Sequence, residues 1–132
     1  MTTPSRIDLP WRSGRGFRVW RYGVGHSQLL LRSPGDGERP SFHILFEAVE
    51  FMKLRRGYPD LVLRLAADDE RAEFAELDSL TVPQLHVVLA SPERTGFVAC
   101  SRVTVRRIAD PSTDSPDAGE VVLSMSRRTG TA

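Results

Sequence analysis

Residues 17–66 read FRVWRYGVGHSQLLLRS (17–33), PGDGERP (34–40), SFHILFEAVEFMKL (41–54), RRGYPD (55–60) and LVLRLA (61–66). Residues 17–22 alternate, with Phe17 and Val19 on one face and Trp20 and Tyr22 on the other, while residues 28–32 and 61–66 are short apolar runs. Both patterns are typical of β-strands. Two glycines at positions 23 and 25 and the Pro- and Gly-rich loop favour turns. The stretch therefore predicts strands joined by short connections.

Residues 41–56 support two interpretations. Ser41 can cap a helix, and apolar residues at helical spacing lead to two arginines and Gly57, which suit a helix end. Residues 42, 44, 46 and 48 are also apolar and alternate, and the aromatic and β-branched side chains among them favour a strand. These local signals alone favour the helix slightly.

The rest of the chain completes a mainly β domain. Strands are predicted at residues 85–90, 97–108 and 121–125, and a short α-helix at 68–77, where acidic residues occupy the first turn. We predict an antiparallel sandwich or open barrel of about seven strands with one short α-helix. Residues 17–126 would form this single domain, after a mobile arm over residues 1–16 and before a frayed tail over 127–132.

Composition is ordinary for a globular domain and excludes several classes of protein. The 132 residues are 40% hydrophobic and 27% charged, which is enough to bury a core without staples. Cys100 is the single cysteine, so neither an internal disulfide nor a cysteine-based zinc cluster can form within one chain. No apolar run approaches the roughly 18 residues of a membrane helix, and the first residues lack the apolar core of a signal peptide. We therefore expect a cytoplasmic protein that does not enter a membrane.

Charge is distributed unevenly, although the net charge is only +1. Residues 1–32 carry six arginines against one aspartate, which gives +5, and residues 67–80 carry six acids against one arginine, which gives −5. The two regions can neutralise each other in the fold, or the basic one can meet an anionic partner. Lys53 is the single lysine among 18 basic residues, and this bias indicates a GC-rich, actinobacterial genome.

Catalytic and cofactor signatures are not found in the sequence. Gly23 and Gly25 begin a G-x-G pattern, but Gln28 stands where a dinucleotide-binding loop needs glycine. His26, His43 and His86 are 17 and 43 residues apart, so they lack the short spacing that places two metal ligands on one element. We expect no cofactor, no metal and no enzymatic activity.

The best candidate for a binding surface is the mixed aromatic and basic segment at residues 11–22. Tryptophan and arginine are over-represented at the energetic centres of protein interfaces. The predicted partner-binding residues are Arg18, Trp20, Arg21, Tyr22 and His26. In the competing interpretation Phe17 and Trp20 are core residues and the arginines are solvated flanks. Specific nucleic-acid binding is disfavoured because the net charge is near zero. Cys100, expected on the same strand face as Arg102, could be a thiolate, although an inert packing role is favoured.

Four segments resemble other proteins: HSQLLLRS (26–33), HILFEAVEFMKL (43–54), DLVLRLA (60–66) and TGFVACSRVTV (95–105). Together they resemble a group of small, uncharacterised actinobacterial proteins and, more distantly, β-rich immunity proteins that neutralise bacterial toxins. The resemblance implies a strand ending in a turn at residues 42–53. It also implies a non-enzymatic protein-binding module that occludes a toxin. The alternative is a small-ligand-binding protein or small enzyme with a cavity between the sheets, centred on His26 or His86.

Overall fold

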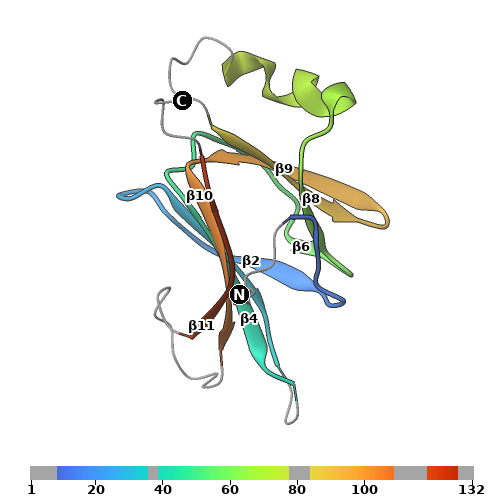
Figure 1. The fold of residues 1–132 in the computed structure, drawn as a ribbon, viewed down its shortest axis with the longest axis vertical. Coiled ribbons are helices and arrows are strands. Elements are labelled where there is room, and N and C mark those ends of the chain that lie inside the picture. The colour runs from blue at the N-terminus through green and yellow to red at the C-terminus, as the bar shows by residue number, and fades with distance from the viewer. Residues whose placement is uncertain (1–8, 36–38, 78–83, 109–118, 128–132) are drawn as a thin grey trace, which may run out of the picture.

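A computed structural model describes residues 9–35, 39–77, 84–108 and 119–127 as two antiparallel β-sheets (Figure 1). The five-stranded sheet has the order β1 (Trp11–Arg12), β7 (Val62–Leu65), β8 (Leu85–Ser91), β9 (Arg94–Cys100) and β5 (Phe51–Lys53). The six-stranded sheet has the order β11 (Glu120–Ser126), β10 (Arg102–Ile108), β4 (Ser41–Glu47), β3 (Gln28–Ser33), β2 (Phe17–Gly23) and β6 (Gly57–Tyr58). The predicted mainly β, antiparallel fold is confirmed, and the described strands form a sandwich of two sheets instead of a closed barrel.

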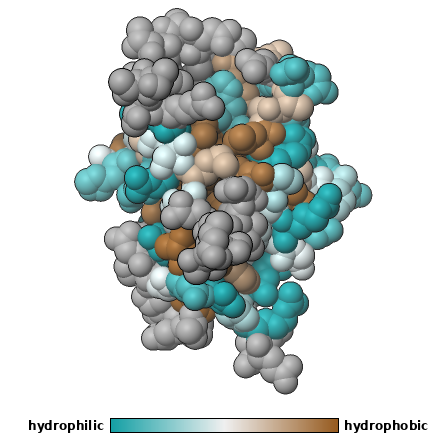
Figure 2. All heavy atoms as spheres, viewed as in Figure 1, coloured by the Kyte–Doolittle hydropathy of each residue, from teal (hydrophilic) through white to brown (hydrophobic). Residues whose placement is uncertain are grey.

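Apolar side chains from both sheets fill the space between them. The six-stranded sheet contributes alternate residues such as Leu29, Leu31 and Ile44, and the five-stranded sheet contributes residues such as Leu63 and Leu89, all fully buried. On the side of the molecule drawn in Figure 2, apolar residues gather toward the middle and hydrophilic residues toward the margins. The period-two alternation of the sequence therefore has its origin in one face of each sheet packing on the shared core.

The chain passes between the two sheets five times, and two of these crossings, after β4 and after β9, lie beside each other. Residues 41–56 form no helix: β4 lies in the six-stranded sheet and β5 in the five-stranded sheet, with Ala48 at a positive φ of 53° between them. Close by, Ser101 separates β9 from β10 and donates hydrogen bonds from its backbone N and its Oγ to the carbonyl oxygen of Glu47. Strands that switch sheets in this way form the corners of a sandwich.

The crossing at Ser101 corrects the single strand predicted over residues 97–108. Val98 and Cys100 face the core in β9, whereas Val103 and Val105 face it in β10, so the inward phase changes at Ser101. Two further strands, β1 and β6, are only two residues long, too short for alternation to be recognised. The described residues form eleven strands instead of about seven, because of these short strands and because the crossings after β4 and β9 each divide a predicted strand.

Residues 9–16, which belong to the predicted mobile arm over residues 1–16, lie within the described part of the chain. Trp11 pairs with Leu63 across β1 and β7, and its side chain is buried against Phe17 and Phe42. Residues 9–16 are therefore part of the sandwich, held by burial of the Trp11 ring together with hydrogen bonds such as that from Ser13 N to the Leu61 carbonyl oxygen. Residues 1–8 and, apart from Arg127, the predicted tail over 127–132 lie outside the described residues.

The acidic segment η1 (Asp68–Leu77) is a 3-10 helix instead of the predicted α-helix. It packs on the outer face of the five-stranded sheet through Phe74, which contacts the rings of Phe51, His86 and Phe97. Glu70 accepts two hydrogen bonds from the Arg64 guanidinium, at 2.6 and 2.8 Å, and Glu73 pairs with Lys53 at 3.5 Å. These acids of η1 thus bind basic residues of the sheet beneath them instead of the N-terminal arginines.

The ion pair between Glu70 and Arg64 predicts an acid-sensitive contribution to stability. Its hydrogen bonds lower the pKa of Glu70 from 4.5 to about 2. A lowered pKa in the folded state stabilises the protein above about pH 4.5 and loses this effect as the pH falls toward 2. We expect Glu70→Gln to reduce the free energy of unfolding by about 1 kcal/mol at pH 7, since the side chain of Arg64 is 35% exposed and solvent screens the pair.

Urea unfolding of wild type and Glu70→Gln at pH 7, 5 and 2.5 measures this contribution. The difference in the free energy of unfolding between the two proteins should be smaller at pH 2.5 than at pH 7 and 5. Glu73→Gln is the matched control, because its pair with Lys53 is longer and both side chains are exposed. A difference for Glu70→Gln that is the same at all three pH values would contradict the assignment.

Candidate binding surface

The outer face of the six-stranded sheet carries a row of basic side chains. In antiparallel strands directly opposite residues share a face. The register places Arg18 opposite Arg32, Arg32 opposite His43, and His43 opposite Arg106. Their neighbours Val19, Leu31 and Ile44 point to the core, so this row across four strands points away from it. Three arginines thus share one cross-strand row.

A second row beside the first has an apolar centre. Arg21 stands opposite Leu30, Leu30 opposite Leu45, and Leu45 opposite Thr104. Leu30 and Leu45 are each only 3% exposed although they lie on the outer face. Arg21, both leucines, Gly23 and Gln28 line a hollow of about 240 Å³. The outer face therefore combines buried apolar groups with a basic rim.

Trp20 lies between these rows at a β-bulge. The register of β2 against β3 shifts between Val19 and Arg21, so Trp20 is the extra residue. Its side chain is 54% exposed, and the Arg32 guanidinium lies 4.5 Å from its ring centre. This cation–π contact holds a large apolar side chain in place at the surface.

We call this surface the basic face. It comprises Arg18, Trp20, Arg21, Leu30, Arg32, Leu45, Arg102 and Arg106. Arg102, at its far end, stands opposite Glu47 and donates from Nε to Ser126 Oγ at 3.2 Å. Among the residues that the described register places on this face, five are arginines and Glu47 is the single acid. The face therefore has a positive excess in a protein whose net charge is only +1.

The structure brings together three of the five predicted partner-binding residues. Arg18, Trp20 and Arg21 lie on the basic face. Tyr22 does not, because the bulge changes the alternation and places Tyr22 opposite the inward-facing Leu29. His26 is exposed in the turn between β2 and β3. Sequence reasoning missed the members contributed by β3, β4 and β10, since only the strand register reveals which residues of different strands are neighbours.

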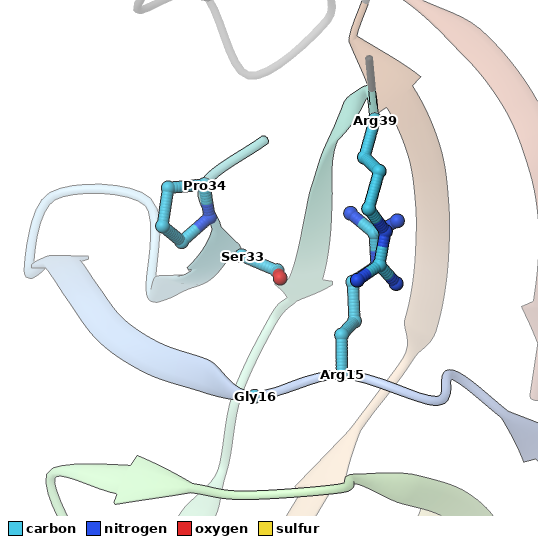
Figure 3. Close-up of a pocket in the computed structure, with 5 residues that line it drawn as sticks. All are labelled: Arg15, Gly16, Ser33, Pro34 and Arg39. Carbon is cyan, nitrogen blue, oxygen red and sulfur yellow. The ribbon is translucent and has the colours of Figure 1, made fainter. Parts of the chain in front are cut away.

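A separate pocket lies where the loops before β2 and before β4 meet. Arg15, Gly16, Ser33, Pro34 and Arg39 line a hollow of about 240 Å³, which we call the arginine pocket (Figure 3). Arg15 and Arg39 extend toward each other from opposite sides, and the Ser33 hydroxyl points toward the space between (Figure 3). These residues are far apart in sequence, and no motif in the chain indicated the pocket.

Arg15 is held in the arginine pocket by contacts at both ends of the residue. Its Nη1 donates to the carbonyl oxygen of Pro40 at 2.5 Å, and its guanidinium lies 4.5 Å from the ring centre of Phe42. Its backbone N donates to Ser13 Oγ at 3.2 Å, and its carbonyl oxygen accepts from Leu61 N at 3.0 Å. The position of the positive charge is therefore fixed by the fold.

The three histidines do not gather at one site. His43 is buried within the arginine row, and His26 lies in an exposed turn. His86 lies on the outer face of the five-stranded sheet, stacked on Phe74 with ring centres 4.3 Å apart. Neither His26 nor His86 faces the space between the sheets, where a cavity centred on them was expected. Within the described parts of the chain, no three histidine, cysteine, aspartate or glutamate residues are grouped to hold a metal ion.

Cys100 is not placed to be a reactive thiolate. Its side chain is fully buried in the core, and this burial raises the pKa of the thiol to about 12. The chain crosses between sheets at Ser101, so the exposed Arg102 does not share a face with Cys100 as the single-strand prediction required. The packing interpretation of Cys100 therefore agrees with the structure.

Comparisons with known proteins identify no relative. No protein-family model, no curated protein and no solved structure matches this chain. In the described part of the chain, none of the helical segments has the length and apolar character needed to cross a membrane.

Proposed function

We propose that this protein is a non-enzymatic binding module whose basic face engages an acidic surface of a protein partner. The observation that carries the proposal is Trp20, a half-exposed tryptophan held by Arg32 on a sheet face that also bears two leucines and five arginines. Large aromatic side chains and arginines at the centre of a patch are the residues that contribute most to protein–protein affinity. A polar rim around an apolar centre is the usual anatomy of such an interface.

Electrostatics favours an acidic partner. Arg18 and Arg32 stand directly opposite each other, and like charges in this relation destabilise a sheet. A carboxylate from a partner would reduce this repulsion and could accept paired hydrogen bonds from a guanidinium. Such a contact raises the association rate and specificity, and it weakens as salt is added.

The concrete version of this function is immunity to a bacterial toxin in the cytoplasm. It rests on the sequence resemblance stated above. In this version the protein acts by occlusion: the basic face covers an acidic site of the toxin, and no chemical step is required. The rigidity of the sheet supports such a role, since side chains that are already ordered lose little entropy on binding.

Trp20→Ala tests the proposal because the substitution should separate binding from folding. We expect a loss of less than about 1 kcal/mol in the free energy of unfolding, since the ring is largely at the surface. Affinity for the partner should fall by about 2 kcal/mol or more, roughly thirtyfold. Quantitative pull-down from the source cells with wild type and variant identifies the partner, and calorimetry with the purified partner measures the loss.

Val24→Ala is the matched control, because Val24 is an 80% exposed apolar residue of the turn between β2 and β3. It should change neither stability nor capture. Arg21→Glu adds a charge reversal on the basic face and should also abolish capture of an acidic partner. If a partner binds wild type, Trp20→Ala and Arg21→Glu with equal affinity, the basic face is not the binding surface.

A further inference from the structure

We propose that the arginine pocket binds a small tetrahedral oxyanion, either inorganic phosphate or the phosphate group of a monoester. The pocket is distinct from the basic face, since none of its lining residues belongs to that surface. Its two guanidinium groups converge from different loops on one hollow, with the Ser33 hydroxyl directed toward the same space (Figure 3). The structure therefore collects donors from three directions around a volume open to a small ligand.

Arg15 is held in a fixed position within the arginine pocket. Its guanidinium is fixed between the Pro40 carbonyl oxygen and the Phe42 ring, so little conformational freedom is lost when a ligand binds. On the opposite side of the pocket, Gly35 N donates to Ser41 Oγ at 3.0 Å, which holds Gly35 beside the start of β4. Arg39 precedes β4 and has an exposed side chain. One arginine is thus preorganised, and the other approaches the same hollow from solvent.

The chemistry of the lining selects the class of ligand. Planar guanidinium groups donate paired hydrogen bonds to carboxylates and phosphates. A carboxylate offers two oxygens in one plane, whereas phosphate offers oxygens in several directions and carries more charge. Two guanidinium groups and a hydroxyl that meet from different sides therefore fit phosphate better. The hollow of about 240 Å³ is smaller than the pockets that hold drug-sized ligands, which begin at about 300 Å³.

Contacts within the protein set the affinity that phosphate can reach. Both Arg15 and Arg39 take part in further interactions inside the chain. A bound anion must add to these contacts or replace them. The free energy of binding is therefore the difference between the contacts made with phosphate bound and the contacts made within the free protein. The sequence between Gly35 and Arg39 contains Asp36 and Glu38, which lie outside the described residues. We therefore expect binding in the millimolar range rather than the nanomolar range.

Calorimetric titration of the full chain with sodium phosphate tests the proposal, with sodium chloride and sodium acetate titrated at matched ionic strength. We expect saturable binding of one phosphate per chain, and weaker binding of acetate. Methyl phosphate distinguishes the two sources of the ligand: if it binds as well as inorganic phosphate the pocket accepts a monoester, and if it does not the site is specific for the free ion. Either outcome supports the oxyanion site.

Three variants locate the binding. Arg39→Gln should weaken phosphate binding about tenfold or more, because it removes one charged donor from the pocket. Arg15→Lys keeps the charge but loses the paired donors and should weaken binding several-fold. Arg56→Gln removes an exposed arginine that does not line the pocket, so it should change the affinity less than twofold. Circular dichroism and urea unfolding verify that each variant is folded.

Three results would overturn the proposal. The first is titration with phosphate that produces no saturable signal beyond that of chloride. The second is an equal effect of Arg39→Gln and Arg56→Gln, which would show general charge attraction instead of a site. The third is acetate that binds as tightly as phosphate. None of these results bears on Trp20 or the basic face, so failure of this proposal is distinguishable from failure of the proposed function.

Discussion

Replacing Gly96 with valine is expected to lower the free energy of unfolding by about 3 kcal/mol. Gly96 lies in β9 opposite the buried Leu89, and a Cβ atom added there would be 2.2 Å from Tyr58 Oη and 2.9 Å from Tyr58 Cζ. Tyr58 is only 1% exposed, and its Oη accepts a hydrogen bond from Arg55 N at 2.6 Å. The ring is therefore fixed against the glycine, and a larger residue forces rearrangement of the core.

Urea unfolding with two further comparisons checks this expectation. Gly25→Val is the control, because the space around Gly25 is open, and it should change stability by no more than about 0.5 kcal/mol. Tyr58→Phe removes the closer of the two clashing atoms, so combined with Gly96→Ala it should cost less than the sum of the single changes. Additive costs, or a Gly96→Val variant as stable as wild type, would show that the ring moves away freely.

The contact between Gly96 and Tyr58 illustrates which parts of the fold can be predicted from the sequence. Strands such as β2, β3 and β8 follow from local alternation or short apolar runs, since each has one face on the core. Gly96 gives no such signal, because the reason for a glycine there lies 38 residues away in Tyr58. Tyr58 itself belongs to the two-residue strand β6, which is too short to show a period.

Predictions failed at positions where the set of alternate side chains that faces the core changes. Alternation continues through residues 97–108, yet the inward face changes at Ser101 because the chain leaves one sheet and enters the other. In β2, the extra residue Trp20 shifts the alternation, so Trp20 and Tyr22 do not share a face of the sheet as predicted. Both events depend on the neighbouring strands rather than on local residue types. The residues of a single strand therefore do not reveal where either event occurs.

The candidate site was only partly predictable for the same reason. Arg18, Trp20 and Arg21 are close in sequence, so their mixed aromatic and basic character was visible. Leu45 and Arg106 join them only through the pairing of β3 with β4 and of β4 with β10. Likewise, Arg15 and Arg39 are 24 residues apart and meet because two loops lie at the same place in the sandwich.

Phe74→Ala is expected to lower the free energy of unfolding by about 3 to 4 kcal/mol. Phe74 is only 1% exposed, stacks on His86 with ring centres 4.3 Å apart, and meets Phe51 and Phe97 edge-on at 5.7 Å. It is the buried member among the described side chains of η1. A 3-10 helix has poor hydrogen-bond geometry and little stability of its own, so η1 depends on this anchor.

Two measurements separate loss of the anchor from a general effect on the core. Urea unfolding gives the global change, and hydrogen exchange over residues 67–77 reports whether η1 detaches, as expected when its largest buried contact is removed. Glu73→Ala, which removes only the exposed pair with Lys53, should change stability by no more than about 0.5 kcal/mol and leave exchange unaltered. If Phe74→Ala costs less than about 1 kcal/mol and η1 stays protected, the Arg64–Glu70 pair holds the segment instead.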